Sequence, residues 1–261
     1  MSSSTFRVSM LLWAVVIAGT VAFVLAPAAL AGGQYGSYGD SGPLADAFTT
    51  QFVGYWNGDR EELPSSLTSI VDYWFRYHLA KAVIAAMVLG VLALIGARQW
   101  RTALSAPNPR SLVPFLATSI LALASSVLVA ANIQGAVAPF SSLMPFLASD
   151  GTPEMQSVFV RVTQALGDPS ASPPLAVMIA DFSRYHVALA VVGTVVALAL
   201  GAASVLSWRR FAITSAAQRR TYAAAGSTSV LITAITLVVV VANVTNAVDP
   251  EHGLLMFFGA R

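Results

Sequence analysis

Long apolar runs dominate the pattern of hydrophobic and polar positions. They lie at residues 8–26, 79–97, 112–131, 187–206 and 227–241. A helix of about 20 apolar residues crosses the roughly 30 Å hydrocarbon core of a membrane. The last run is rich in Val, Ile and Thr, but it is also predicted to be helical, because a lone strand cannot bond its backbone groups in lipid. The pattern predicts an all-α integral membrane protein with five transmembrane helices.

The first apolar run has two interpretations. Arg7 before the run and the small-residue triplet Ala29-Leu30-Ala31 are typical of a cleavable signal peptide. The run is also long enough to remain in the membrane as a signal anchor. Five spans remain if residues 1–31 are retained, and four remain if they are cleaved.

Shorter helices are predicted between the spans. The Gly-, Ser- and Tyr-rich segment 32–42 has no period and is predicted to be a flexible linker. Residues 45–56 have apolar positions near helical spacing, and 57–59 should end that helix. Further helices are predicted to start at Pro64, where the helix is expected to continue into the second span, at 153–166, and at Pro173.

The sequence also contains an internal repeat. At an offset of 108 residues, Arg-Tyr-His at 76–78 matches 184–186, and Trp-Arg at 100–101 matches 208–209. At an offset of 111, the pattern A-N-[IV]-x-x-A-V-x-P at 131–139 matches 242–250. Apolar bias does not explain matches that include His, Arg, Asn, Trp and Pro, so duplication is the favoured source.

The repeat predicts the domain organisation. An N-terminal hydrophobic segment at 1–31 is followed by repeat 1 at 32–147 and repeat 2 at 148–261. Each repeat holds two spans, so both copies have the same orientation, with a pseudo-two-fold axis along the membrane normal. We expect two tandem parallel repeats that form a four-helix bundle with an outer helical layer.

Charge predicts the orientation in the membrane. Only 10% of residues are charged, 56% are hydrophobic and the mean hydropathy is +0.71. None of the twelve acidic residues lies in the first span or in the two segments that join spans two to three and four to five. By the positive-inside rule those segments are cytoplasmic, the N-terminus is cytoplasmic if uncleaved, and the C-terminus is external. The arginines in question are Arg7, Arg98, Arg101, Arg110, Arg209, Arg210, Arg219 and Arg220.

Composition restricts the cellular location, the partners and the kinds of site that are expected. The Ala-rich, Lys-poor usage is typical of membrane proteins from high-GC bacteria, which predicts a multi-pass protein of the plasma membrane. Anionic membrane lipids account for the basic segments, so no nucleic-acid partner is expected. The chain contains no cysteine, which excludes disulfides, thiolate metal sites and a Cys nucleophile. No recognisable catalytic motif is present, so no catalytic residue is assigned and the protein is expected to be non-catalytic.

A polar layer is predicted at the outer ends of the spans. His78 precedes Arg98 by 20 residues, or about 30 Å of helix, which places it at the outer membrane boundary. In the structural interpretation, the spacings of Asp72–Arg76 and Asp181–Arg184 allow ion pairs along their helices, and each histidine bonds to an asparagine or to a backbone carbonyl. The residues expected in this layer, as a binding site or a structural belt, are Arg76, Tyr77, His78, Asn132, Arg184, Tyr185, His186 and Asn243.

Two other interpretations of the layer remain open. His78 and His186 are candidate ligands of a metal or of haem b, with His252 as a third ligand. Each helix carries a single histidine, however, and the spans carry no carboxylate. The layer is alternatively an outer-leaflet site of a small-molecule or lipid transporter or channel. The spans hold no charged residue beyond Lys81, whereas ion paths usually contain such residues.

The favoured expectation is an accessory or assembly subunit. Its outer helical layer would contact a protein partner or a second copy of the chain. The expectation rests on aromatic residues predicted to lie on the outer surface beside the acidic residues, namely Phe48, Phe52, Tyr55, Trp56, Phe140, Phe146 and Phe159.

Overall fold

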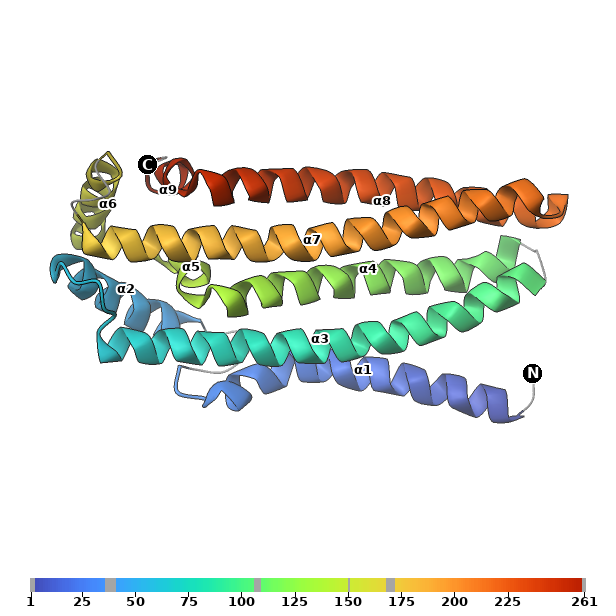
Figure 1. Ribbon diagram of the computed structural model, residues 1–261. Coiled ribbons are helices and arrows are strands. Elements are labelled where there is room, and N and C mark those ends of the chain that lie inside the picture. The colour runs from blue at the N-terminus through green and yellow to red at the C-terminus, as the bar shows by residue number, and fades with distance from the viewer. Residues whose placement is uncertain (1–2, 36–40, 106–108, 150, 168–171, 260–261) are drawn as a thin grey trace. The chain divides into compact units, whose positions relative to one another are not determined.

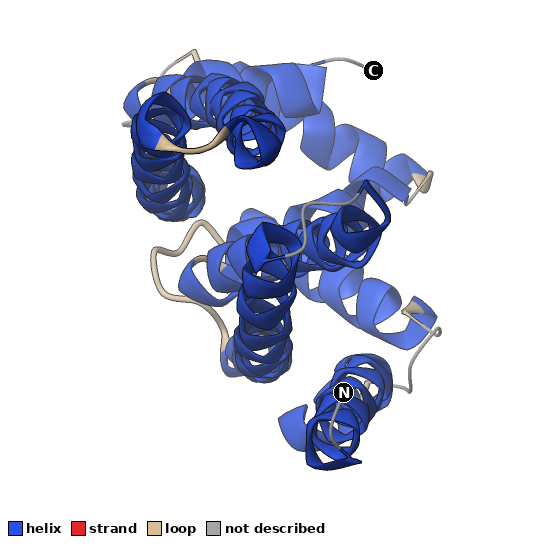
Figure 2. Cartoon of the chain, turned by 90° about the vertical axis from the view of Figure 1, so that its right-hand side faces the viewer, coloured by secondary structure: helices blue, strands red, loops and turns tan. Residues whose placement is uncertain are grey.

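The protein is all-helical, as the sequence predicts. A computed structural model describes residues 3–35, 41–105, 109–149, 151–167 and 172–259. Figure 2 shows that these residues form helices joined by loops, with no strand among them. The predicted flexible linker at 32–42 lies partly outside the described residues.

The predicted helices are present in the expected order (Figure 1), together with short helices at 139–149 and 250–259 that the sequence did not predict. The α-helices are α1 (Ser3–Ala31), α2 (Gly42–Asn57), α3 (Ser65–Ser105), α4 (Pro109–Val137), α5 (Pro139–Leu143), α6 (Pro153–Ala165), α7 (Pro173–Ile213), α8 (Ala216–Val248) and α9 (Pro250–Gly259). A 3₁₀ helix, η1 (Met144–Ser149), follows α5 directly.

Five helices in the described part of the chain are long and apolar enough to cross a membrane. They comprise Phe6–Ala31, Ser65–Ser105, Leu112–Val137, Pro173–Ile213 and Gln218–Val248. The chain therefore has the architecture of a multi-pass membrane protein. α3 and α7 have 41 residues each, or about 60 Å of helix, so they are about twice as long as a hydrocarbon core requires. The short helix predicted after Pro64 continues into the second span, as expected.

Proline and glycine define several helix ends. Proline occupies the first turn of α2, α5 and α6, where its missing N–H and fixed φ suit the start of a helix. At α6 the Thr152 hydroxyl also accepts the Met155 N–H at 3.3 Å. α2 ends at Asn57, followed by Gly58 and then Asp59 with a φ of +45°, so the predicted break at 57–59 is present.

The chain packs as two compact units. Unit 1 comprises residues 1–23, 82–130 and 190–241, and unit 2 comprises residues 24–81, 131–189 and 242–261. Each unit therefore includes parts of both predicted repeats. The repeat boundaries at 32–147 and 148–261 stay a prediction.

Unit 2 has an aromatic core. The Phe140 ring lies 6.0 Å from Phe48, 6.2 Å from Phe52 and 6.2 Å from Tyr55, measured between ring centroids. The side chains of Leu67, Leu143, Met155 and Leu175 are completely buried beside them. Burial, with a smaller contribution from the charge of Glu61, raises the pKa of Tyr55 to about 12.

The prediction that aromatic residues lie on the outer surface is wrong. Phe48, Phe52, Tyr55 and Phe140 are at most 2% exposed, Trp56 and Phe159 are also buried, and Phe146 is half-buried. The reason is that short amphipathic helices in contact with water must bury their apolar faces against one another. The six buried residues belong to the core of unit 2 and do not form a surface for a partner.

Unit 1 consists of parts of the long apolar helices. α1 packs on α3 through Val16, Leu92 and Ile95, and a Cβ at Gly19 would lie only 2.5 Å from the Val88 side chain. Ser125 of α4 donates to the Ala85 carbonyl of α3 at 3.0 Å. Ser204 of α7 donates to the Gly226 carbonyl of α8 at 3.1 Å. Small residues and hydroxyl groups are typical contacts between helices in a membrane.

Candidate functional site

Each repeated histidine of unit 2 bonds to the asparagine of its own repeat. His78 Nδ1 lies 2.9 Å from Asn132 Oδ1, and His186 Nδ1 lies 2.8 Å from Asn243 Oδ1. An amide oxygen only accepts, so Nδ1–H is the donor in each pair and Nε2 is left as the acceptor. The structural interpretation of these four residues therefore agrees with the geometry.

The surroundings of the two pairs correspond as well. The Trp74 ring lies 4.6 Å from the His78 ring, and the Phe182 ring, 108 residues later, lies 4.5 Å from the His186 ring. Trp74 Nε1 donates to Ser142 Oγ at 2.7 Å. At the corresponding positions, Phe182 lies against Gly253, where an added Cβ would be 2.7 Å from the ring. The offsets found in the sequence thus recur as contacts, which supports duplication.

His78 is the more enclosed of the two histidines. An added Cβ at Gly135 would lie 2.7 Å from the His78 ring, so the backbone of α4 approaches closely only because residue 135 is glycine. His78 Nε2 is buried and has no hydrogen-bond partner. His186 has Asn246 at the position that corresponds to Gly135.

The two repeated tyrosines, Tyr77 and Tyr185, make different contacts. Tyr77 stacks on Trp74 with the ring centroids 5.0 Å apart, and Lys81 Nζ lies 5.1 Å from the Tyr77 ring centroid. Tyr185 is half-buried beside His186, with the ring centroids 5.4 Å apart.

One of the two predicted ion pairs forms. Arg184 is exposed and its Nη2 lies 3.1 Å from Asp181 Oδ1. The pair predicted between Asp72 and Arg76 does not form, although the structure describes both residues. Both side chains are exposed, so water solvates their charges.

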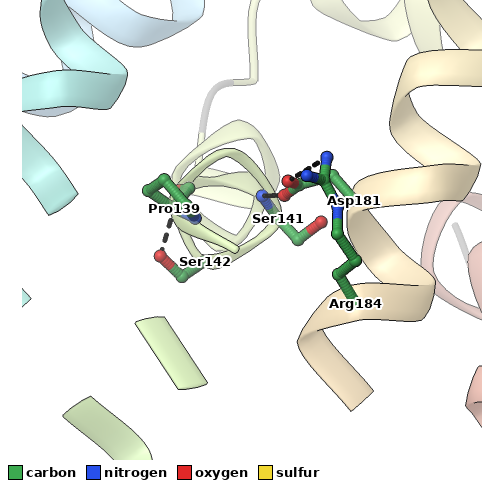
Figure 3. Close-up of polar contacts among 5 residues, drawn as sticks. All are labelled: Pro139, Ser141, Ser142, Asp181 and Arg184. Atoms are coloured by element: carbon green, nitrogen blue, oxygen red, sulfur yellow. Dashed lines mark hydrogen bonds and ion pairs between the residues drawn. The ribbon is translucent and has the colours of Figure 1, made fainter. Parts of the chain in front are cut away.

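A buried carboxylate links α7 to α5, and sequence reasoning missed this contact (Figure 3). Asp181 of α7 is 5% exposed, and its Oδ2 accepts the backbone N–H of Ser141 at 2.7 Å. Ser141 is the third residue of α5, where a helix N–H has no partner within the helix. Ala138, directly before α5, has no side-chain acceptor for it.

The corresponding helix α9 uses a local cap. Asp249 matches Ala138 at the 111-residue offset, and its Oδ1 accepts the N–H of His252, the third residue of α9, at 3.2 Å. The carboxylate that caps α5 in repeat 1 therefore comes from Asp181, 40 residues away on α7. The carboxylate that caps α9 in repeat 2 comes from Asp249, directly before that helix. Alanine in place of aspartate at position 138 is the sequence signal for this difference.

Unit 1 contains a pocket that the sequence did not predict. Its volume is about 360 Å³, and α3, α4, α7 and α8 all line it. We call it the four-helix pocket. α3 contributes Trp100 and α7 contributes Val196 and Leu200, while α4 and α8 contribute apolar, Ala, Ser and Thr side chains. The pocket belongs to unit 1, which also contains the arginines at the predicted cytoplasmic ends of the spans, whereas the predicted polar layer belongs to unit 2.

Aromatic residues and a hydrogen bond hold the pocket's helices together. The Trp100 ring lies 5.0 Å from Phe115 of α4 and 5.7 Å from Tyr222 of α8, measured between ring centroids. Gln218 Nε2 of α8 donates to the Leu104 carbonyl of α3 at 2.9 Å. The end of α3 and the start of α8 are therefore side by side.

The residues described here provide no cluster for a metal ion. No three His, Cys, Asp or Glu side chains among them lie close enough to share one. In the haem alternative only Nε2 of each histidine would be free, since Nδ1 is used by asparagine, and Nε2 of His78 is enclosed by the protein. Haem ligation by His78 and His186 stays a prediction, as does a role for His252.

The fold defines the class of the protein, namely a multi-pass membrane protein with a helical core outside the apolar spans. No protein-family model, no curated protein and no solved structure matches the chain.

Proposed function

We propose that this protein is a non-catalytic protein of the plasma membrane that binds a lipid or another amphipathic small molecule in the four-helix pocket. The observation that carries the proposal is the pocket itself, which has a volume of about 360 Å³. Ligand sites in proteins typically have volumes of roughly 300–1,000 Å³ and mostly apolar linings. The proposal keeps the expected lipid or small-molecule class and assigns it to a different place in the chain.

The lining favours an apolar group over a polar one. The hydroxyls of Ser119 and Ser126 donate to the carbonyls of Phe115 and Ala122 on their own helix, each at 2.8 Å. These hydroxyls offer only acceptor oxygens to a ligand, and the lining holds no charged side chain. Burying a polar group without hydrogen bonds costs free energy, whereas a hydrocarbon chain carries no such cost.

The arginine distribution supports the proposed orientation. All the acidic residues belong to unit 2, whereas the C-terminal ends of α3 and α7 and the N-terminal ends of α4 and α8 carry arginine and no carboxylate. The positive-inside rule assigns these segments to the cytoplasm and the C-terminus to the outside. The pocket residues Trp100 and Thr221 are close in sequence to these segments, so the ligand would enter from the cytoplasmic leaflet.

The accessory-subunit expectation rested in part on exposed aromatic residues, and six of the seven named residues are buried in the core of unit 2. A protein partner or a second copy therefore stays an expectation without a surface assigned to it.

Quenching of Trp100 fluorescence tests the pocket. The protein is reconstituted with phosphatidylcholine that carries bromine on its acyl chains, and the Trp100 signal is the difference between the wild type and Trp100→Phe. Bromine quenches tryptophan on contact, so a chain in the pocket should quench this signal. Ala225→Phe and Ser229→Leu fill the pocket and should protect Trp100, each measured against the same variant carrying Trp100→Phe.

Ala234→Phe is the matched control, because Ala234 is exposed on the same helix and does not line the pocket. It should leave the quenching unchanged. Equal quenching of Trp100 in Ala225→Phe, Ser229→Leu and the wild type would show that bromine reaches Trp100 from the bulk lipid, and the proposal would fail.

A further inference from the structure

We propose that the ligand of the four-helix pocket is an anionic phospholipid whose headgroup is bound by Arg101 and Arg220. The inference rests on the proposed function, because it assigns a ligand class to the same pocket. Its basis is the combination of an apolar pocket with positive charge beside it and no carboxylate in the same unit.

Unit 1 has an uncompensated positive charge. Not one of the twelve acidic residues of the chain falls within residues 1–23, 82–130 or 190–241. In the proposed orientation the arginines of this unit face the anionic lipids of the cytoplasmic leaflet, which attract positive charge. The arginines in these ranges are Arg7, Arg98, Arg101, Arg110, Arg209, Arg210, Arg219 and Arg220.

Arg101 and Arg220 are adjacent in sequence to residues that line the pocket. Arg101 follows the pocket residue Trp100 on α3, and Arg220 precedes the pocket residue Thr221 on α8. The bond from Gln218 to the Leu104 carbonyl joins the two helices at this end. Both arginines are exposed, and their long side chains can reach across apolar surface while the charged end stays in the headgroup region.

The neighbouring Arg219 is already engaged. Its Nε donates to the Thr214 carbonyl at 3.4 Å, and its guanidinium lies 5.7 Å from the Phe211 ring centroid. No carboxylate of the described residues forms an ion pair with Arg101 or Arg220. These two guanidinium groups are therefore assigned to the ligand.

The chemistry matches a phospholipid. Guanidinium presents five N–H donors that pair with two phosphate oxygens at once, and it keeps its charge at every physiological pH. The apolar lining accepts an acyl chain, and the Trp100–Tyr222 pair has the amphipathic character typical of the region between chain and headgroup. Each arginine near a membrane surface is expected to strengthen binding of an anionic lipid about fivefold.

The test repeats the Trp100 quenching with two brominated lipids that share their acyl chains, anionic phosphatidylglycerol and zwitterionic phosphatidylcholine. Phosphatidylglycerol should give half-maximal quenching at a mole fraction at least about fivefold lower. Arg101→Gln with Arg220→Gln should remove this preference and leave the quenching by phosphatidylcholine unchanged.

Arg209→Gln with Arg210→Gln is the matched control. It removes the same charge from exposed arginines of α7 that lie at least nine residues beyond Leu200, so the preference should persist. Loss of the preference in this control as well would show general attraction of anionic lipid and would overturn the inference. Equal quenching of the wild type by both lipids would also overturn it and leave the proposed function standing. Absence of pocket-dependent quenching by either lipid would reject the proposed function itself.

Discussion

Residue 138 shows how one substitution between repeats changes a helix cap. An aspartate before a helix accepts the N–H of the third helical residue, as Asp249 does in α9. Ala138 cannot do this in α5, and Asp181 of α7 accepts the corresponding N–H of Ser141 instead. The link joins residues 40 positions apart and connects a helix of repeat 1 to a helix of repeat 2.

We expect Asp181→Ala to destabilise the protein by about 1.5–3 kcal/mol, the range for a hydrogen bond to a charged group. Ala138→Asp in the same chain should restore about 1 kcal/mol, since it supplies the cap locally. The measurement is the free energy of unfolding in mixed micelles with increasing dodecyl sulfate.

Asp249→Ala, which removes the local cap of α9, is the control for the size of a single cap. If Ala138→Asp gives no recovery in the Asp181→Ala background, the carboxylate does not act as a cap for α5.

At the scale of elements, α1 packs against other parts of the chain, and the sequence did not predict these contacts. Gly19 lies against Val88 of α3 in unit 1, and Ala31 is 1% exposed in the core of unit 2. A signal peptide that is removed has no need of such contacts. The packing therefore favours retention over cleavage, the two interpretations that composition left open.

We predict that the protein purified from membranes keeps residues 1–31. Mass spectrometry of its peptides should cover residues 1–31, and Gly19→Leu should lower the melting temperature because the added side chain collides with Val88. Gly90→Leu is the control, since an added Cβ at Gly90 meets nothing within 4 Å. A chain that begins after residue 31 would contradict retention, and so would an equal effect of the two substitutions.

At the scale of the whole molecule, the distribution of charge predicts which parts of the chain face each side of the membrane. The chain has no cysteine, so a single introduced cysteine reports its own position. We expect a membrane-impermeant maleimide to label Glu154→Cys on intact cells, and to label Ser215→Cys only after the cells are opened. Both positions are exposed, so access depends on the side of the membrane alone. Labelling in the reverse order would contradict the proposed orientation.

Much of the candidate polar layer was predictable, because helical spacing converts sequence distance into height along a span. His78 and Asn132 bond to each other because both lie at similar distances from the arginines at the other ends of their helices, and the same applies to His186 and Asn243. The ion pair of Asp181 with Arg184 was also predicted from spacing within one helix. The contact of Asp181 with Ser141 was not, because it joins two helices whose relative rotation is not encoded in either one.

The sequence by itself determined the all-α membrane class, the five apolar helices long enough to span a membrane, the start of α7 at Pro173 and the similar height of the repeated His and Asn residues. These depend on hydrophobic length, helix period and local backbone preferences, which are properties of neighbouring residues. Only the tertiary structure decided that Phe48, Phe52 and Phe140 form a core, that Asp181 caps α5, and that a pocket remains beside Trp100. These depend on which helix faces meet and on the space their side chains leave unfilled, and such quantities exist only once the helices are packed.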